Sequence, residues 1–332
     1  MKRLLLTLIV LGILSLLTVS CGGSDGTLTI YSGRSEELVG PVISRFEDET
    51  DIDVEVRYGD SAELAATILE EGDNSPADVF FAQDPASLGV VAIGDLFATL
   101  PTEITDLVAA RFSDDEGRWV GVSGRSRVLV YDTSTVEASE LPSSEDELTG
   151  EAWAGRVAIA PTNGSFLAFV AAKVLLDGEE ATLAWLQAME DNGSPTYSSN
   201  SVIVTAVNDG EVDTGLVNHY YRFQLEAELG EIVVANHFLS GGAGSLVMPA
   251  GAGILARSGT RDEAAELLRF LLDDEAQTYF AEETFEYPLV EGIAPNSQLP
   301  PLDTLTPPEL DLSALATVLD VATDLVADAG LL

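Results

Sequence analysis

The chain has 332 residues, of which 46% are hydrophobic, so it is long enough for two domains of ordinary size with apolar cores. Its 56 acidic residues outnumber its 15 basic residues and give a formal charge of −41, which argues against nucleic acid as a partner. One cysteine and two histidines exclude an intrachain disulfide, a cysteine-based metal site and a cage of several histidines.

The first residues have the pattern of a secretory leader. The basic start MKR is followed by the apolar run LLLTLIVLGILSLLTV and by SCGG, which is similar to a lipoprotein cleavage site. We therefore expect a signal peptide over 1–20, a lipid on Cys21 and a linker over 21–26. The alternative is an uncleaved membrane anchor, but the run is short for a membrane span. Without 1–20 the chain keeps 13 basic and 56 acidic residues, a formal charge of −43.

Strand-like and helix-like segments alternate along the first part of the chain. In order, the patterns predict a strand at 28–33, a helix at 35–50, a strand at 51–59, a helix at 61–72 and a strand at 77–82. This alternation is typical of a mainly parallel sheet that helices cover on both faces. The β-rich run at 119–134 is long enough to cross between two domains.

A second alternating set follows this run. It comprises a strand at 156–161, helices at 166–178, 179–192 and 201–210, a strand at 211–217, a helix at 222–229, a strand-like run at 244–259, a helical stretch after Thr260 and a final amphipathic helix at 312–330. We expect two α/β lobes, the first over 27–125 plus 246–286 and the second over 126–245 plus 287–332. In such sheets a ligand lies outside the carboxyl ends of the strands, so we expect a cleft there.

Two strand-to-helix loops of the first lobe carry polar residues. In YSGRSEE (31–37), Ser35 stands where it would cap the next helix, with Glu36 and Glu37 in its first turn. In FAQDPAS (81–87), Asp84 precedes a proline and fits a cap position, whereas Gln83 has no evident structural role.

Two loops of the second lobe lead into helices. APTNGSF (160–166) places Asn163, Gly164 and Ser165 at a helix start, and in YSSNSV (197–202) Ser199 or Asn200 caps another helix. Free backbone N–H groups at a helix start attract anions. The two loops predict an anion pocket that contains no basic side chain.

The stretch GLVNHYYRFQ (215–224) sets Tyr220 and Tyr221 at a turn between a strand and a helix, directly after Asn218 and His219. Only at such a turn can two adjacent side chains reach one point. A neutral phenol is a poor metal ligand, but a hard cation such as Fe³⁺ can displace its proton and bind the phenolate. The alternative interpretation is that two aromatic rings pack at a helix start.

Several segments together resemble the ferric-ion-binding proteins, which are the solute receptors of bacterial ABC iron importers. They are YSGRS, SPADVFFAQDPA, WVGVSGRSRVLVYDT, PTNGSF, SSNSVIVTAVNDGEVDTGLVNHYY and EYPLVEG, in this order from about Leu28 to the C-terminus. The resemblance implies an α/β, two-lobed periplasmic-binding-protein fold of class II, with two mixed sheets flanked by helices and a hinge of crossing strands. It also implies a monomeric, extracytoplasmic receptor that delivers ferric iron to ABC permease and ATPase subunits, with the lipid as its membrane anchor.

Position by position, the resemblance implies that Tyr220 and Tyr221 are the iron ligands. It implies that a synergistic anion, carbonate or phosphate, is held by Asn163, Gly164, Ser165, Asn200 and Asn218. Possible first-lobe contacts to the metal or the anion are Ser35, Glu36, Gln83 and Asp84.

The chain departs from the family pattern in the first lobe. Many members have a histidine where this chain has Ser35 and a glutamate where it has Gln83. Either the anion and water complete the coordination of the metal, or Glu36, Glu37 or Asp84 substitutes for the missing ligands. We therefore expect iron binding that depends more heavily on the anion than is usual in the family. His219 is not a family ligand by position, and we expect its side chain to face away from the tyrosines.

Two other functions compete with this interpretation. A receptor of the same fold for an organophosphonate or an iron chelate would use the anion loops and leave the tyrosines as packing residues. A hydrolase needs a nucleophile oriented by a base, but the chain has two histidines and neither a GxSxG nor an HExxH motif. The sequence therefore indicates a binding protein and not an enzyme.

Overall fold

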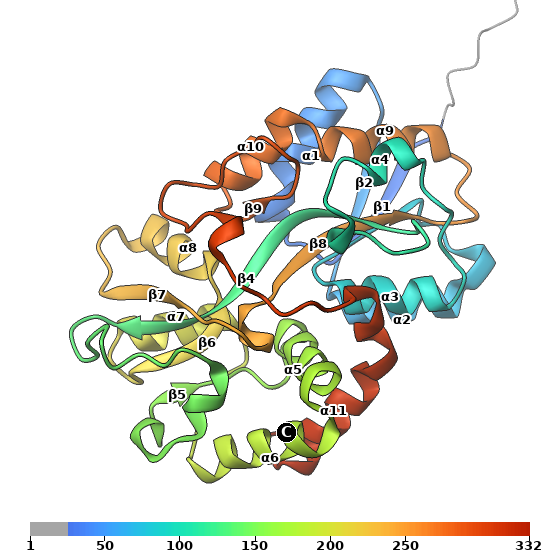
Figure 1. Cartoon of the computed structure of the whole chain (residues 1–332). Coiled ribbons are helices and arrows are strands. Elements are labelled where there is room, and N and C mark those ends of the chain that lie inside the picture. Colours follow the sequence, from blue (N-terminus) through green and yellow to red (C-terminus); the bar gives the residue numbers. More distant parts are fainter. Residues whose placement is uncertain (1–25) are drawn as a thin grey trace, which may run out of the picture.

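The computed structural model describes residues 26–332, which form two α/β halves joined by long strands (Figure 1). The predicted signal peptide, the lipidation site at Cys21 and the linker up to residue 25 lie outside the described residues. Within residues 26–332, no helix combines the length and the apolar character that a membrane crossing requires.

The elements follow the alternation that the sequence predicts, but the sheet is not mainly parallel as expected, because every strand pair made by β4 or β8 is antiparallel. The strands are β1 (Leu28–Ser32), β2 (Val54–Tyr58), β3 (Val79–Ala82), β4 (Val120–Asp132), β5 (Val157–Ala158), β6 (Thr214–Asn218), β7 (Val234–Phe238), β8 (Val247–Ile254) and β9 (Tyr287–Pro288). The α-helices are α1 (Glu36–Thr50), α2 (Ser61–Glu71), α3 (Pro85–Ile93), α4 (Thr102–Thr105), α5 (Gly164–Asp177), α6 (Glu179–Asp191), α7 (Asn200–Asn208), α8 (Tyr220–Leu229), α9 (Arg261–Leu271), α10 (Asp274–Glu282) and α11 (Leu319–Asp328).

Strand β4 belongs to both halves of one continuous, mixed sheet with the order β2-β1-β3-β8-β4-β6-β5. As far as Ser126 it pairs antiparallel with β8, and from Arg127 onward it pairs antiparallel with β6, while β7 lies along its other edge. The partner change therefore falls between two consecutive residues. The two predicted sheets are the two halves of this sheet, and the predicted crossing run at 119–134 is β4 (Figure 1).

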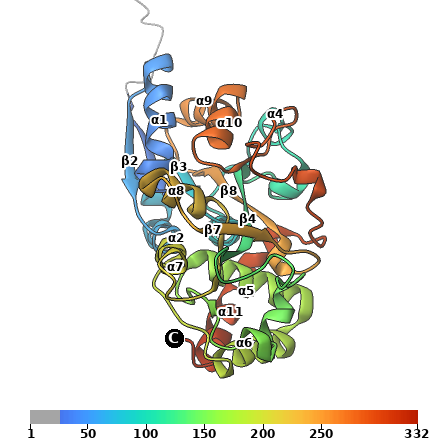
Figure 2. The same cartoon turned by 90° about the vertical axis from the view of Figure 1, so that its left-hand side faces the viewer.

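Each half buries its own hydrophobic core. The first core packs β1, β3, α1, α9 and α10 around side chains such as Phe46 and Phe280. The second packs α5, α6 and α11 around Phe166, Phe169 and Trp185. Seen from the side, the two halves lie one above the other, with β4 and β8 running between them (Figure 2). Separate cores are what two lobes require, although the exact lobe boundaries stay a prediction.

The C-terminal segment connects the two halves on one side of the molecule. The short helix Leu312–Val318 packs against α3 of the first half, and α11 packs against α5 and α6 of the second. The approach to α3 requires Gly89, because a Cβ at that position would lie 2.6 Å from the Cβ of Ala316. The predicted helix at 312–330 is thus interrupted, since Val318 adopts φ −123° and ψ 9°.

Candidate functional site

The two tyrosines lie side by side at the mouth of the turn between β6 and α8. Tyr220 and Tyr221 are the first two residues of α8, and their ring centroids are 4.4 Å apart with an interplanar angle of 32°. Tyr220 is buried and Tyr221 is partly exposed. The structure therefore brings the two phenols together, as the sequence predicts for a strand-to-helix turn.

The surroundings of Tyr221 keep its phenol protonated. Burial raises the pKa of Tyr221, and the adjacent Tyr220 hydroxyl raises it further, whereas Arg34 and Arg125 act in the opposite direction. A ligand that removes this proton must therefore carry strong positive charge. This is the behaviour required of a phenol that ionises only when a hard cation binds.

The polar residues at the starts of α5 and α7 form one hydrogen-bonded group. Asn163 caps α5, and its Oδ1 accepts from Ser165 N at 3.1 Å and from Ser165 Oγ at 2.6 Å. Asn200, the first residue of α7, donates through Nδ2 to Asn163 Oδ1 at 3.2 Å and to Ser165 Oγ at 3.1 Å. Ser199 caps α7. A Cβ at Gly164 would meet nothing within 4 Å, so there is free space in front of α5.

A cationic side chain joins this group, which corrects the prediction of an anion pocket without one. Arg127 Nη2 donates to the Ser165 carbonyl at 2.6 Å and to Ser165 Oγ at 3.2 Å. Asn218 is the cross-strand partner of Arg127, so it lies beside the same group. Burial and the neighbouring Arg125 lower the pKa of Arg127 to about 9.

Arg34 and Arg125 continue this line of buried cations toward the first half. Both residues are 2% exposed. Arg34 pairs with the Glu286 carboxylate at 2.7 Å, and although burial opposes its charge, Glu286 and then the two tyrosines raise its pKa. Burial lowers the pKa of Arg125. The YSGRS and GRSR motifs contain these arginines, but nothing in the local sequence pattern marks the three side chains as buried.

Several buried donors at this point have no hydrogen-bond partner among the described residues. They are Nε and Nη1 of Arg125, Nε of Arg34 and Nδ2 of Asn218. Leaving buried donors unpaired is costly, most of all when they carry charge. Donors of this kind, gathered between the tyrosines and the start of α5, fit an anion.

The first-lobe loops offer little that could bind a metal. Ser35 is exposed at the start of α1, and its side chain makes no capping hydrogen bond, contrary to the prediction. Glu36 is exposed and lies near Tyr58, whose pKa burial and Glu36 raise. Asp84 caps α3 as predicted, with its two oxygens accepting from Ser87 N at 2.8 Å and Ser87 Oγ at 3.0 Å.

The His219 side chain binds backbone groups through both ring nitrogens, but its ring packs edge-on against Tyr220 at a centroid distance of 5.9 Å, so it does not face away from both tyrosines as the sequence predicts. Its Nδ1 accepts from Ser126 N at 3.1 Å, so Nε2 carries the proton and donates to the Phe285 carbonyl at 2.6 Å. Burial lowers its pKa to about 4. Within residues 26–332, no group of three or more histidine, cysteine, aspartate or glutamate residues could hold a metal ion.

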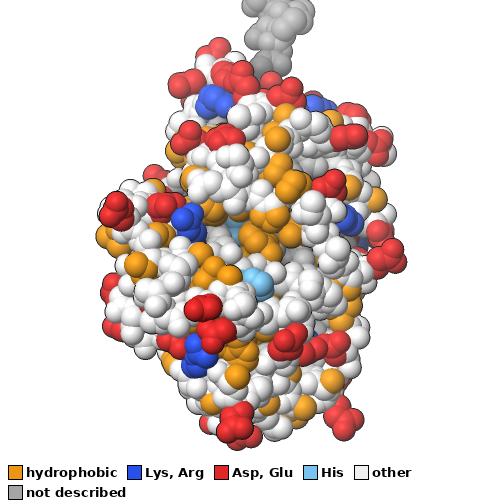
Figure 3. Space-filling view, turned by 60° about the vertical axis from the view of Figure 1, so that its left-hand side comes forward, with side chains coloured by type: hydrophobic (Ala, Val, Ile, Leu, Met, Phe, Trp, Pro, Cys, Tyr) orange, Lys and Arg blue, Asp and Glu red, His pale blue; other side chains and the backbone are white. Residues whose placement is uncertain are grey.

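Small cavities adjoin the anion group, and a larger groove leads to the tyrosines. One cavity of about 10 Å³ is lined by Arg125, Arg127, Ser165 and Asn218. Another, of about 40 Å³, places Gln83 and Asp84 opposite Asn163 and Gly164. A groove of about 450 Å³ between α1, α7, α8 and α10 reaches Tyr221. Figure 3 shows acidic side chains scattered over the surface rather than gathered at one point.

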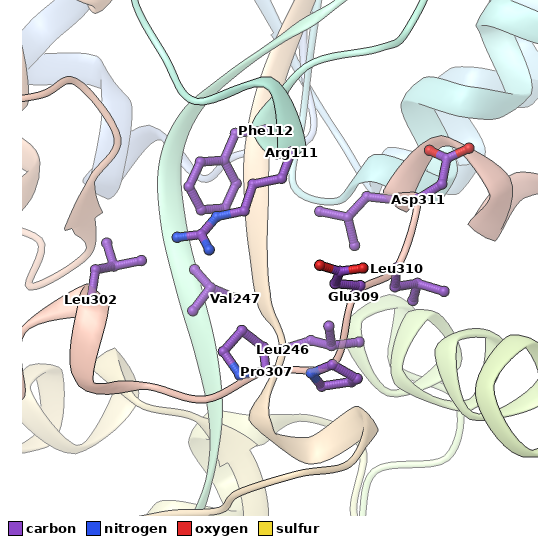
Figure 4. Close-up of a pocket in the computed structure, with 11 residues that line it drawn as sticks. Arg111, Phe112, Leu246, Val247, Leu302, Pro307, Glu309, Leu310 and Asp311 are labelled. Atoms are coloured by element: carbon purple, nitrogen blue, oxygen red, sulfur yellow. The ribbon is translucent and has the colours of Figure 1, made fainter.

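A separate cavity of about 520 Å³ lies between β8 and the C-terminal segment and is mainly apolar (Figure 4). Leu246, Val247, Leu302 and Pro307 line it, with Arg111 at one side. It contains none of the tyrosines, asparagines or buried arginines described above, so we place the functional site in the cleft.

A two-lobed α/β fold with buried polar groups between its halves is typical of extracellular solute receptors. The chain matches the family model described as bacterial extracellular solute-binding protein over residues 42–302. It is 34% identical to the Fe(3+)-binding periplasmic protein of Serratia marcescens over 313 residues, which cover 93% of this chain and 92% of that protein. It is 33% identical to the major ferric iron-binding protein of Neisseria meningitidis serogroup B, with 92% and 93% covered.

The fold agrees with this match. The structure of iron-bound HitA from Pseudomonas aeruginosa superimposes with a TM-score of 0.87 at 34% identity, covering 92% of this chain and 99% of that one. The chain therefore belongs to the bacterial extracellular solute-binding proteins, and among them to the family of these ferric-ion-binding proteins, as its sequence motifs predict.

Proposed function

We propose that this protein is an extracytoplasmic receptor that binds Fe³⁺ together with a small anion in the cleft between its lobes. The observation that carries the proposal is the juxtaposition of Tyr220 and Tyr221 with a line of buried, incompletely paired cationic donors. The names of the relatives, which are ferric-iron-binding proteins, support the choice of metal. In this role Fe³⁺ is the transported solute.

The charges of the site explain why an anion would be needed. Two tyrosinates leave one positive charge on Fe³⁺, and Arg34, Arg125 and Arg127 add three more, against which Glu286 supplies one negative charge. Burying such an excess is unfavourable unless a partner compensates it. A dianion held by the Asn163, Ser165 and Asn200 group and by Arg125 would provide both charge and oxygen ligands.

The dimensions of the site favour a small oxyanion. The cavities beside the anion group, about 10 and 40 Å³, have room for about one to a few water molecules. Carbonate or phosphate is closer to this size than an organophosphonate or a polycarboxylate chelate. We propose carbonate or phosphate with the five residues of the predicted anion group as its donors: Asn163, Gly164, Ser165, Asn200 and Asn218.

The remaining features of the role are supported by the leader sequence and by the family resemblance. We propose that Cys21 carries a lipid that anchors the protein outside the cytoplasm, and that the monomer delivers iron to the permease and ATPase subunits of an ABC transporter. We propose no enzymatic activity, because His219 has both ring nitrogens engaged and His237 Nε2 contacts the Pro142 carbonyl at 2.7 Å. Neither is placed beside a nucleophile as a general base would be.

The test is optical. Ferric salt added with phosphate or bicarbonate should produce a visible tyrosinate-to-iron charge-transfer band in the wild type and in Tyr58→Phe, whose phenol lies on the surface of β2. The band should disappear or lose most of its intensity in Tyr221→Phe. A colourless wild type would refute ferric binding by the tyrosines, and an unchanged band in Tyr221→Phe would refute the ligand assignment.

A further inference from the structure

His219 is attached by two bonds to the residue at which β4 changes partners. Its backbone N donates to the Ser126 carbonyl at 3.0 Å, and its Nδ1 accepts from Ser126 N at 3.1 Å. Ser126 is the last residue of β4 that pairs with β8, and Arg127 is the first that pairs with β6. The residue directly before the tyrosine pair is thus bound to the junction between the two halves of the sheet.

The other ring nitrogen reaches the first half of the molecule. Nε2 donates to the carbonyl of Phe285 at 2.6 Å, in the connection between α10 and β9. The next residue, Glu286, holds Arg34 in the first-lobe loop at 2.7 Å. A second contact runs in parallel, because the Phe285 ring stacks on Phe223 of α8 with a centroid distance of 4.4 Å and an angle of 2°.

The backbone departs from its usual pattern at both His219 and Phe285, the two residues that this contact joins. His219 occupies the N-cap position of α8, yet its side chain makes no capping hydrogen bond and turns back to Ser126 and Phe285 instead. Phe285 adopts φ 57°, a left-handed conformation that a bulky residue rarely takes without compensating contacts. The imidazole is completely buried and packs against Tyr220 and Tyr287, with centroid distances of 5.9 and 5.2 Å.

We propose that His219 is a positioning residue that fixes the tyrosine pair relative to both β4 and the first lobe. As a result, the geometry of the metal ligands and the closure of the lobes change together. The inference rests on the proposed ferric function. A rigid imidazole suits this role because its two nitrogens lie on opposite edges of one ring and reach both lobes at once. When the lobes separate, the bond to Phe285 must stretch or the tyrosine pair must move with it.

Two substitutions separate the two bonds. In His219→Asn, the amide can replace Nδ1 and accept from Ser126 N, but it is too short to reach Phe285. In His219→Gln, the longer amide can replace Nε2 and donate to the Phe285 carbonyl, but it loses the side-chain bond to Ser126 N, while the backbone bond to the Ser126 carbonyl remains. The matched control is His237→Gln on β7, because His237 Nε2 also contacts a backbone carbonyl, that of Pro142, and lies away from the tyrosines.

The measurements are the position of the charge-transfer band and the rate at which it decays when a competing chelator is added. We expect His219→Asn to release iron about 10-fold faster than the wild type, since changes just outside a metal's ligands typically cost 10–100-fold in affinity. We expect His219→Gln to shift the band maximum, because the start of α8 keeps its backbone bond to Ser126 but loses the side-chain bond that fixes the position of residue 219 on β4. His237→Gln should match the wild type in both measurements.

The outcomes distinguish this inference from the proposed function. If the wild type shows no charge-transfer band, the ferric function fails, and the band cannot report on His219. Small-angle scattering of the wild type and of His219→Asn then measures the separation of the lobes. This comparison decides whether His219 couples the two lobes. If the wild type shows the band but both His219 variants keep its position and decay rate while only their melting temperatures fall, His219 has a structural role alone and the inference is wrong.

Discussion

The two walls of the cleft contribute different chemistry. The second-half wall supplies the candidate metal ligands Tyr220 and Tyr221 and the neutral donors at the starts of α5 and α7. The first-half wall supplies Arg34 together with a loop in which Asp84 is committed to Ser87. Between the walls, β4 places Arg125 and Arg127 on the shared strand.

If the first-half wall lacks the metal ligands that the family pattern leads us to expect, an anion held between the walls would have to take their place. A guanidinium cannot bind a cation, but it can hold an anion that does. An oxyanion placed between Arg125 and the start of α5 would present oxygen atoms to the metal where relatives are expected to use histidine and glutamate. The specificity of the site for its metal would then depend on the anion as much as on the tyrosines.

The largest expected effect is a steep dependence of iron affinity on pH, because the candidate ligands on the second-half wall are phenols. Burial raises the pKa of Tyr221, so its phenol is protonated at neutral pH and must lose the proton when iron binds. With two phenols each releasing one proton, affinity should fall by about 100-fold for each unit of pH decrease. Competition against a chelator of known pH dependence, followed at the charge-transfer band, measures the slope.

The Tyr221→Phe variant provides the comparison for that slope. If it still binds iron weakly, its affinity should change by about 10-fold per pH unit, because one phenol remains. A pH-independent affinity in the wild type, once the proton uptake of the anion is subtracted, would show that the tyrosines do not bind as phenolates.

Removing the Arg125 guanidinium should stabilise the ligand-free protein but weaken its binding of iron. Arg125→Met replaces a buried guanidinium whose Nε and Nη1 lack partners among the described residues. We expect the free energy of unfolding of the ligand-free protein to rise by about 1–3 kcal/mol, because the substitution removes buried donors that have no hydrogen-bond partner. Iron affinity in the presence of phosphate or carbonate should fall about 10–100-fold.

Arg111→Met is the matched control, since its guanidinium is exposed, stacks on Phe112 at 4.7 Å and lines the separate apolar cavity instead of the cleft. Thermal melts with and without ferric salt and anion measure both quantities. A destabilised ligand-free Arg125→Met protein with unchanged anion dependence would mean that Arg125 is a structural residue.

Restoring ligands on the first-half wall should give the smallest effect. Ser35→His combined with Gln83→Glu introduces the residue types that the family pattern leads us to expect there. We expect the affinity measured without added anion to rise by about 10-fold, whereas the affinity with saturating anion changes little, since the new ligands replace those of the anion. Titrations with and without bicarbonate, using the single variants for comparison, check this; equal gains under both conditions would contradict it.

The regular elements could be predicted well from local patterns. Helix α1 spans Glu36–Thr50 where 35–50 was expected, because its apolar residues recur at helical spacing and acidic residues fill its first turn. The helical stretch after Thr260 is instead two helices, since the Asp273 side chain accepts from Ala276 N at 2.6 Å and starts α10 anew. Strand β7 has no periodic signal of its own and exists because β4 offers it an open edge.

The candidate site was predicted in part. Adjacent phenols at a turn and asparagine or serine residues at helix starts are local features, so Tyr220, Tyr221, Asn163 and Ser165 could be identified before the fold was known. Arg34, Arg125 and Arg127 could not, because a basic residue next to a glycine or within a strand is most often solvent-exposed, and only long-range packing buried these three.

The sequence by itself determined the α/β alternation, the family and the residues at helix starts, because each depends on neighbours within a few positions along the chain. The tertiary structure alone decided which charges face the tyrosines, that His219 is bound to Ser126 and Phe285, and that the first-half wall is cationic. The physical reason is that burial and electrostatic interaction act between atoms close in space, and the residues concerned lie up to 252 positions apart.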